Sequence, residues 1–159
     1  AQPVVPAGIA IDSRSAIYLA DGGNQRVVRA TPFTAEGAPQ PTSAPPRPEL
    51  TWLPHTELPH LHQPGYVHLD GQGRLWVSDT GNNRVVSYER QGDGWRSVRV
   101  LSGLNGPVGV AASPTGEVFV AESGANQVSQ FDPTGDTAAS TIPGFNDPQG
   151  IAYQLRGAG

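Results

Sequence analysis

One segment of about twenty-five residues occurs three times along the chain, and a shortened fourth copy follows. Residues 64–88, PGYVHLDGQGRLWVSDTGNNRVVSY, align without a gap with residues 6–29 at an offset of 58 positions. The pattern returns at residues 107–131, 43 positions later, and begins again at Pro148. The copies therefore start at 6, 64, 107 and 148. A period in the forties that is built from short strands is typical of the blades of a β-propeller.

Each copy contains three predicted strands of about five residues that are rich in β-branched and aromatic side chains. An acidic residue and a Gly-rich link, DGGNQ, DTGNN or ESGAN, join the second strand to the third and predict a hairpin. The first strands are expected at 8–12, 66–70 and 109–113, the second at 16–20, 74–78 and 117–121, and the third from residues 26, 84 and 127. A fourth, outer strand is expected at 49–53, 94–101 and 138–142.

The combined pattern P-x-G-I-A-hydrophobic-D, hydrophobic-Y/W-V-A/S-D and x-G-N-x-R-V resembles the NHL repeat. The resemblance implies an all-β fold, a β-propeller with four-stranded blades around a central channel, commonly six-bladed in this family. The chain would then form about half of such a ring. The predicted segments are blade 1 at about 4–61 with a Pro-rich insertion at 31–61, blade 2 at 62–105, blade 3 at 106–146 and the start of blade 4 at 147–153.

A half-ring leaves blade faces and sheet edges uncovered, so something must complete it. Residues 150–153 are expected to form one first strand more than the number of complete blades. In a ring of two copies, this strand would compete with the first strand of the partner. The sequence therefore favours completion by more chain over completion by a second copy.

Composition excludes several classes of function. The chain has no cysteine, and its ten cationic residues are all Arg against fourteen acidic residues, which gives a net charge of −4. No basic stripe of the kind that nucleic-acid binding needs is present. No apolar run approaches the length of a membrane span. The start AQPVVPAG, which lacks Met, favours an exported protein that is extracellular, periplasmic or on the cell surface.

The Pro-rich insertion and the loops beside it hold the candidate binding residues. Residues 31–61 contain eight of the sixteen prolines, which disfavours regular strand pairing. Aromatic side chains outside the repeat pattern are free to contact a partner, as are polar side chains of the turns. The predicted binding residues are Trp52, His60, His62, Tyr66, Asn82 and Asn83.

All four histidines lie within fourteen positions, PHTELPHLHQPGYVH. His60 and His62 on an extended segment, with His68 or Glu57, could form an open three-ligand metal site. A solvated loop that contains histidines explains the same pattern more simply, and propeller enzymes draw their ligands from several blades. The prediction is therefore that no metal and no cofactor is bound.

Two pairs of opposite charge recur across the predicted hairpins, Asp21 with Arg26 and Asp79 with Arg84. Because the pair repeats, a structural role in holding the turn is preferred over a catalytic one. The third copy has Glu122 and Gln127 at these positions, so its hairpin is expected to be held less tightly.

The motifs of common enzymes are missing: there is no G-x-S-x-G, no H-E-x-x-H and, without Lys, no P-loop. No catalytic residue is predicted. The preferred function is a non-catalytic binding module in which the propeller presents loops to a protein, peptide or glycan. The alternative is a metal-dependent propeller hydrolase or lyase of the lactonase type.

Overall fold

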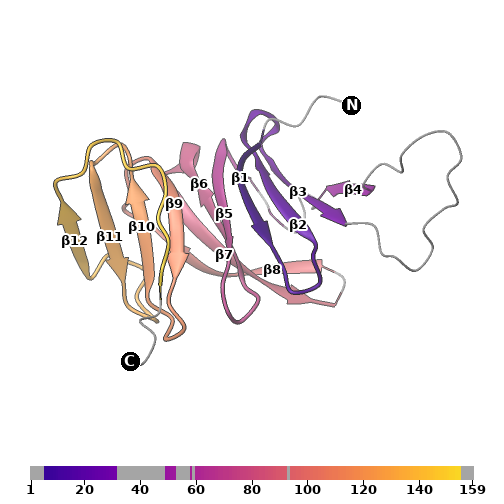
Figure 1. The fold of residues 1–159 in the computed structure, drawn as a ribbon. Helices are drawn as coiled ribbons and strands as arrows, with labels where there is room; N and C mark the ends of the chain where they lie inside the picture. The colour runs from indigo at the N-terminus through magenta and orange to yellow at the C-terminus, as the bar shows by residue number, and fades with distance from the viewer. Residues whose placement is uncertain (1–5, 32–48, 53–57, 59, 93, 155–159) are drawn as a thin grey trace, which may run out of the picture.

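The chain forms three separate antiparallel sheets in a computed structural model that describes residues 6–31, 49–52, 58, 60–92 and 94–154 (Figure 1). The first sheet contains β1 (Pro6–Ile11), β2 (Ile17–Asp21), β3 (Arg26–Thr31) and β4 (Glu49–Trp52). The second contains β5 (Pro64–Leu69), β6 (Leu75–Asp79), β7 (Arg84–Gln91) and β8 (Gly94–Leu101). The third contains β9 (Pro107–Ala112), β10 (Val118–Glu122), β11 (Gln127–Phe131) and β12 (Ser140–Pro143).

The strands of each sheet follow one another in chain order, and the first strands of successive sheets lie beside each other. Thus β1 contacts β5, and β5 contacts β9, while β4, β8 and β12 form the far edges (Figure 1). This arrangement is a fragment of a β-propeller, and the predicted fold class is confirmed. The sheets are called blades 1, 2 and 3 below.

The outer strands lie outside the repeated segment. They occur at 49–52, 94–101 and 140–143, close to the predicted 49–53, 94–101 and 138–142. Most of the predicted Pro-rich insertion, residues 32–48 and 53–57, lies outside the described residues.

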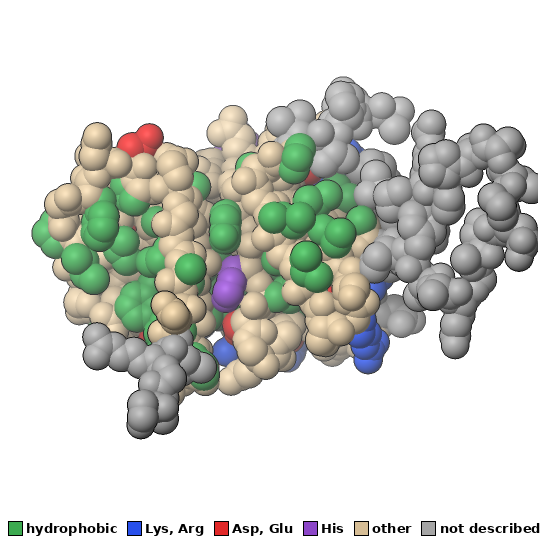
Figure 2. Space-filling view, viewed as in Figure 1, with side chains coloured by type: hydrophobic (Ala, Val, Ile, Leu, Met, Phe, Trp, Pro, Cys, Tyr) green, Lys and Arg blue, Asp and Glu red, His purple; other side chains and the backbone are tan. Residues whose placement is uncertain are grey.

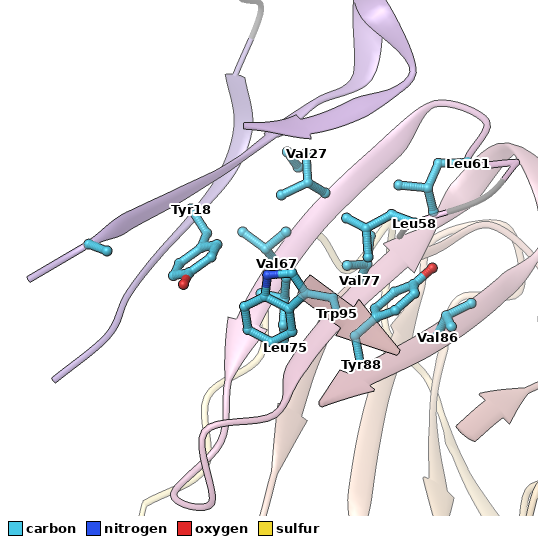
Figure 3. Close-up of a cluster of buried hydrophobic side chains, with 12 residues drawn as sticks. Tyr18, Val27, Leu58, Leu61, Val67, Leu75, Val77, Val86, Tyr88 and Trp95 are labelled. Atoms are coloured by element: carbon cyan, nitrogen blue, oxygen red, sulfur yellow. The ribbon is translucent and has the colours of Figure 1, made fainter. Parts of the chain in front are cut away.

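A cluster of buried apolar side chains joins blade 1 to blade 2 (Figure 3). Blade 1 contributes Tyr18 and Val27, and blade 2 contributes a larger group that includes Tyr88 and Trp95. Leu58 and Leu61, at the end of the predicted insertion, are also buried in this cluster. Full burial of one leucine side chain stabilises a fold by about 1.5–3 kcal/mol, so the end of the insertion is part of the core rather than a loop.

A second cluster joins blade 2 to blade 3. Its buried side chains are Trp76, Val85, Leu101, Leu104, Val110, Val118, Val120 and Phe131. Consecutive side chains of a strand point to opposite faces, and in β6 Leu75 and Val77 join the first cluster whereas Trp76 joins the second, so blade 2 packs against a neighbour on both of its faces. The contact between blades is therefore the main source of burial in this fold.

The repeat also appears in the backbone conformation. Three positions of each repeat have a positive φ. One lies in the turn between the first and second strands, one is the last residue of the link between the second and third strands, and one directly precedes the next copy of the repeat. They are Ser15, Gly73 and Gly116; Gln25, Asn83 and Asn126; and Gln63, Gly106 and Asp147. The third set includes Asp147, so the pattern continues into the fourth copy.

Residues 150–153 are not a strand, which corrects the prediction made for this segment. They nevertheless lie where the first strand of a next blade would lie. A Cβ atom on Gly109 would be 2.9 Å from the Cα of Gly150, just as one on Gly8 would be 2.8 Å from the Cα of Tyr66. A first strand is fixed by pairing with the second strand of its own blade, and the described residues include no such partner for this segment.

Two short 3-10 helices, η1 (Gly22–Asn24) and η2 (Thr80–Asn82), follow the second strands of blades 1 and 2. No helix among the described residues has the length and the apolar character required to cross a membrane.

The close contact between the first strands allows a test of the blade packing. We expect Gly8→Ala to lower the free energy of unfolding by about 1–3 kcal/mol, because the new methyl group would meet the backbone of β5 and force the strands apart. Gly71→Ala is the control, since a Cβ there meets nothing within 4 Å. Chemical denaturation of both variants measures the difference, and equal stabilities would contradict the close packing of β1 on β5.

Candidate functional site

The fold has two ends at which a site could form. The helical end carries η1 and η2 and the segments that lead into β5 and β9. The turn end carries the turns between the first and second strands and between the third and fourth strands. The first strands run from the helical end to the turn end (Figure 1).

At the helical end, the fully buried carboxylate of Asp79 holds three segments of blade 2 together. Its Oδ2 accepts hydrogen bonds from Arg84 Nε at 2.6 Å and Asn82 Nδ2 at 2.9 Å. Its Oδ1 accepts the backbone N–H of His62 at 2.7 Å. The carbonyl oxygen of His60 accepts from Asn82 Nδ2 at 2.8 Å. The side chain of Asn82 is therefore used within the blade.

Blade 1 has the same arrangement around the buried Asp21. Its carboxylate accepts from Arg26 Nε at 2.8 Å and from Asn24 Nδ2 at 2.9 Å. The two ion pairs, Asp21 with Arg26 and Asp79 with Arg84, are thus built into equivalent turns of the scaffold.

Blade 3 replaces the ion pair with neutral donors. Glu122 is buried, and its Oε1 accepts from Gln127 Nε2 at 3.0 Å and from the hydroxyl of Ser129. Its Oε2 accepts the backbone N–H of Asn105 at 2.6 Å. The carboxylate of blade 3 is therefore fully hydrogen-bonded, and the loss of the cation does not leave it without donors. Ser129 stands where blade 2 has Val86. The sequence shows this difference, but only the structure shows that the hydroxyl of Ser129 donates a hydrogen bond to Glu122.

Asn83 connects blade 2 to blade 3. Its backbone has φ 52°, and its Oδ1 accepts the backbone N–H of Gly106 at 2.9 Å. Asn126 repeats this contact with the backbone N–H of Asp147, also at 2.9 Å. A side chain that makes the same bond in successive repeats is part of the scaffold.

The other predicted binding residues are distributed over several elements. The side chains of His60 and His62 are exposed at the helical end, next to Asn82 and Gly81. Tyr66 lies in β5, half-buried against the cluster between blades 2 and 3. Trp52 lies in β4, paired with Val28 of β3.

The proposed metal ligands are only partly within the described residues, since His55 and Glu57 lie outside them. No group of three or more His, Asp or Glu side chains within the described ranges could hold a metal ion.

His68 belongs to β5 and faces blade 3. Its Nε2 accepts the backbone N–H of Ala112 at 3.4 Å. Burial lowers the pKa of His68 below its ordinary value, and the negative charge of Asp70 offsets this effect only in part. The neutral imidazole is the form that can accept this hydrogen bond between blades.

The turn end carries a cavity of about 660 Å³ between blades 1 and 2. The β1–β2 turn, the β5–β6 turn and the β7–β8 hairpin surround it. Its lining includes Ile11, Asp12, Ser13, Arg14, Tyr18, Leu69, Asp70, Gly71, Gly73, Arg90, Gly92 and Trp95. On the face seen in Figure 2, most of the blue Arg side chains lie along the lower edge, which is this end of the molecule.

Two buried rings form one wall of this cavity. Tyr18 of blade 1 and Trp95 of blade 2 meet edge to face with their centroids 5.7 Å apart (Figure 3). The guanidinium of Arg90 lies over the Trp95 ring, 5.1 Å from its centroid, and its Nη2 donates to the Tyr18 hydroxyl at 3.5 Å. The position of Arg90 is therefore fixed from one side.

The two carboxylates of the cavity are occupied by the turns. Asp12 Oδ1 accepts the backbone N–H groups of Arg14 and Ala16 at 2.9 and 2.8 Å. Asp70 Oδ2 accepts from Arg74 Nε at 2.8 Å and Trp76 Nε1 at 3.0 Å.

The pKa of Asp70 reflects these bonds. Burial alone would raise the pKa of Asp70, but the hydrogen bonds from Trp76 and Arg74 and the charge of Arg74 together lower it. Asp70 is a structural anion.

Sequence reasoning missed this cavity. Arg14 is aligned with Gln72 and Thr115 in the other repeats, and Arg90, two residues beyond the repeat, is aligned with Pro133. Trp95 lies in an outer strand, outside the repeated segment. The available signal was this departure from the repeat, but only the packing of blade 1 against blade 2 brings the three side chains together.

Comparison with known proteins agrees with the geometry. Residues 104–131 match the NHL repeat model. A PE-PGRS family protein of Mycobacterium tuberculosis is 41% identical over 49 residues, which cover 31% of this chain and 11% of that protein.

Solved structures show the same fold. Virginiamycin B lyase from Staphylococcus aureus, crystallised with quinupristin, superposes with a TM-score of 0.62 and 21% identity over 92% of this chain and 45% of the lyase. A chain of the nidogen/laminin complex superposes with a TM-score of 0.51 and 14% identity, over 95% of this chain and 69% of that one. The chain thus spans less than half of the length of the lyase. At these identities, the likeness shows the fold alone.

The first prediction from this geometry concerns the buried carboxylate of blade 2. We expect Arg84→Ala to lower the free energy of unfolding by about 1–3 kcal/mol, because Asp79 would remain buried without its cation. The matched control is Arg96→Ala, which breaks an exposed pair with Glu89 at 3.7 Å and should cost at most about 1 kcal/mol. Denaturant titrations distinguish the two, and a smaller loss for Arg84→Ala than for the control would refute the scaffold role.

The second prediction concerns His68. Its folded pKa lies below the ordinary 6.5, so the unfolded chain binds more protons and stability falls as the pH drops through 6.5 towards the folded pKa. We expect His68→Gln to reduce this decline between about pH 7.5 and about pH 5.5. Thermal unfolding of both proteins across this range measures the effect. An unchanged pH dependence in the variant would show that His68 is not responsible.

Proposed function

From an NHL repeat at residues 104–131 and a fold of three propeller blades, we propose that the protein is a non-catalytic binding module whose ligand site is the cavity between blades 1 and 2. The cavity binds part of a protein, peptide or glycan partner, or a small molecule that carries the same chemical groups as that part. The blades hold the three turns that form the walls, and this rigid support is what a recognition site on loops requires.

The observation that carries this proposal is that non-repeating residues converge on one cavity. The residues that recur in each blade, such as Asp79 and Asn83, spend their polar atoms on the turns and on the next blade. Arg14, Arg90 and Trp95 do not recur, yet all three line the same space. A feature that only one pair of blades possesses is not needed for building blades, and this supports a role in binding.

At the helical end, fewer polar groups are available to a ligand, because several of them bind other parts of the scaffold. His60 and Asn82 are joined through a backbone carbonyl, and Asn83 is bound to Gly106. The exposed rings of His60 and His62 remain available for contact with a partner, so this end is a second part of the proposed surface.

Completion of the ring is a further part of the proposal. Ile9 and Ile11 of β1 are 56% and 62% exposed, on the face of blade 1 that points away from blade 2. On blade 3, residues 150–153 already occupy the position of a next first strand, and Tyr153 stacks on Phe119 with centroids 6.2 Å apart. This asymmetry supports closure by further blades of the same chain rather than by a second copy. An exported or cell-surface location suits such a module.

The test of the proposed function is a search for ligands in the intact protein. A library of short peptides and oligosaccharides is screened by NMR, with the indole N–H of Trp95 as the reporter of the cavity. We expect Ser13→Trp, which places a large side chain in the cavity, to abolish binding of the peptides or oligosaccharides found. Thr134→Trp, an exposed position at the same end of blade 3, is the control and should leave binding unchanged.

The same protein is tested for the alternative of a metal-dependent hydrolase or lyase. Elemental analysis of the purified protein should find no stoichiometric metal that His60→Ala and His62→Ala remove. One equivalent of metal lost in both variants would overturn the binding proposal in favour of the enzyme.

A further inference from the structure

We infer that the cavity between blades 1 and 2 recognises a carboxylate attached to an apolar group, with Arg14 and Arg90 as its cationic contacts. This inference rests on the proposed function, because it names the chemistry of the ligand in the same cavity. It follows from the balance of donors and acceptors, from the apolar part of the wall, and from a contact between blades 2 and 3.

Among the polar groups of the lining, the two carboxylates already accept hydrogen bonds, whereas the two arginines still have donors to offer. Asp12 and Asp70 accept hydrogen bonds from their own turns, and Asp70 is also paired with Arg74. Arg14 and Arg90 form no ion pair with any of the residues that the structure describes. Both arginines line the cavity, so it offers guanidinium N–H donors to a ligand. A planar guanidinium with five donors matches a carboxylate in geometry.

Arg90 is prepared for such a ligand. Its guanidinium stacks over Trp95 and donates to Tyr18, which fixes the side chain before a ligand arrives. Prior fixation lowers the entropy that binding must supply. Arg14 also lines the cavity, in the turn that Asp12 holds.

The contact between blades 2 and 3 shows which groups satisfy an arginine at this end of the fold. Arg99 of blade 2 lies over Trp76, and its Nη2 donates to the carbonyl oxygens of Asp132, at 2.6 Å, and of Gly135. Its Nε lies 3.4 Å from the Asp136 carboxylate. The turn of blade 3 thus supplies carbonyl and carboxylate oxygens to Arg99. Arg90 has no such oxygen from a described residue apart from the Tyr18 hydroxyl, so its other N–H donors are open to a ligand.

The remaining wall determines the rest of the ligand. The half-buried Leu69 belongs to the lining, which favours an aliphatic or aromatic body next to the carboxylate. A sugar is disfavoured, because Tyr18 and Trp95 are 1% and 7% exposed and offer no open ring face for stacking. The same chemistry occurs in a free organic acid and in an apolar residue at the C-terminus of a peptide.

The experiment uses the intact protein with two carboxylates and their neutral amides as probes. Hexanoate represents a free acid, N-acetyl-leucine represents a peptide C-terminus, and hexanamide and N-acetyl-leucinamide are the uncharged controls. NMR titration that follows the Trp95 indole N–H and the Arg90 Nε–H gives each dissociation constant. The carboxylate that binds more tightly identifies the source.

We expect each amide to bind about tenfold more weakly than its acid, and Arg14→Gln or Arg90→Gln to weaken the acids by a similar factor. Arg90→Lys keeps the charge and should recover part of the loss, which separates recognition from damage to the wall. Arg96→Gln, an exposed arginine of β8 that does not line the cavity, is the matched control and should change the dissociation constant by less than about twofold.

The outcomes separate the two proposals. If the amides bind as well as the acids, or if neither Arg14→Gln nor Arg90→Gln weakens the acids, the carboxylate inference is wrong. The proposed function still stands in that case, provided that Ser13→Trp abolishes binding of the probes. If neither these probes nor the peptide and oligosaccharide library shifts the Trp95 signal, both the carboxylate inference and the cavity as a binding site are wrong.

Discussion

The buried carboxylate at the end of each second strand is the interaction on which the rest of the structure depends. Asp79 and Glu122 accept the backbone N–H of the segment that enters the blade and the side-chain donors of the following turn. A carboxylate without exposed surface is costly unless such donors surround it. The bonds therefore fix the path of the chain between blades. Because that path is fixed, the apolar faces of successive blades meet in register and bury the two core clusters.

Blade 3 shows that the requirement is for donors rather than for an ion pair. Gln127 and Ser129 take the place of the side-chain donors Arg84 and Asn82 of blade 2. The backbone N–H of Asn105 binds Glu122 as that of His62 binds Asp79, and both carboxylates are buried. Four positions of the network differ between the two blades, yet the carboxylate still binds the entering segment and the following strand. The neutral network avoids the burial of a second charge, whose desolvation can exceed the gain from the pair.

The division between repeated and unrepeated residues also separates scaffold from candidate site. Polar side chains that recur hold turns and link blades, as Asn83 and Asn126 do. The unrepeated Arg14 and Arg90 are not part of that plan, and the contact between blades 1 and 2 gathers them with Trp95 around one cavity. In the neighbouring contact, the same end of the fold is filled by Arg99 and the turn of blade 3. Blades with the same scaffold residues can thus have different side chains at the contacts between them.

The sequence by itself determined the blades, because alternation of apolar residues, turn chemistry and the period of the repeat all act over short distances. Strand positions, the hairpins and the carboxylates that hold them were predicted from these local signals, and the outer strands of blades 2 and 3 occur at 94–101 and 140–143 where 94–101 and 138–142 were predicted. The tertiary structure alone decided which unrepeated side chains become neighbours. Arg14 and Arg90 are 76 positions apart in the chain and line one cavity only because blade 1 packs on blade 2. It likewise decided that residues 150–153 take the place of a first strand without forming one, since strand pairing needs a partner that lies elsewhere in space.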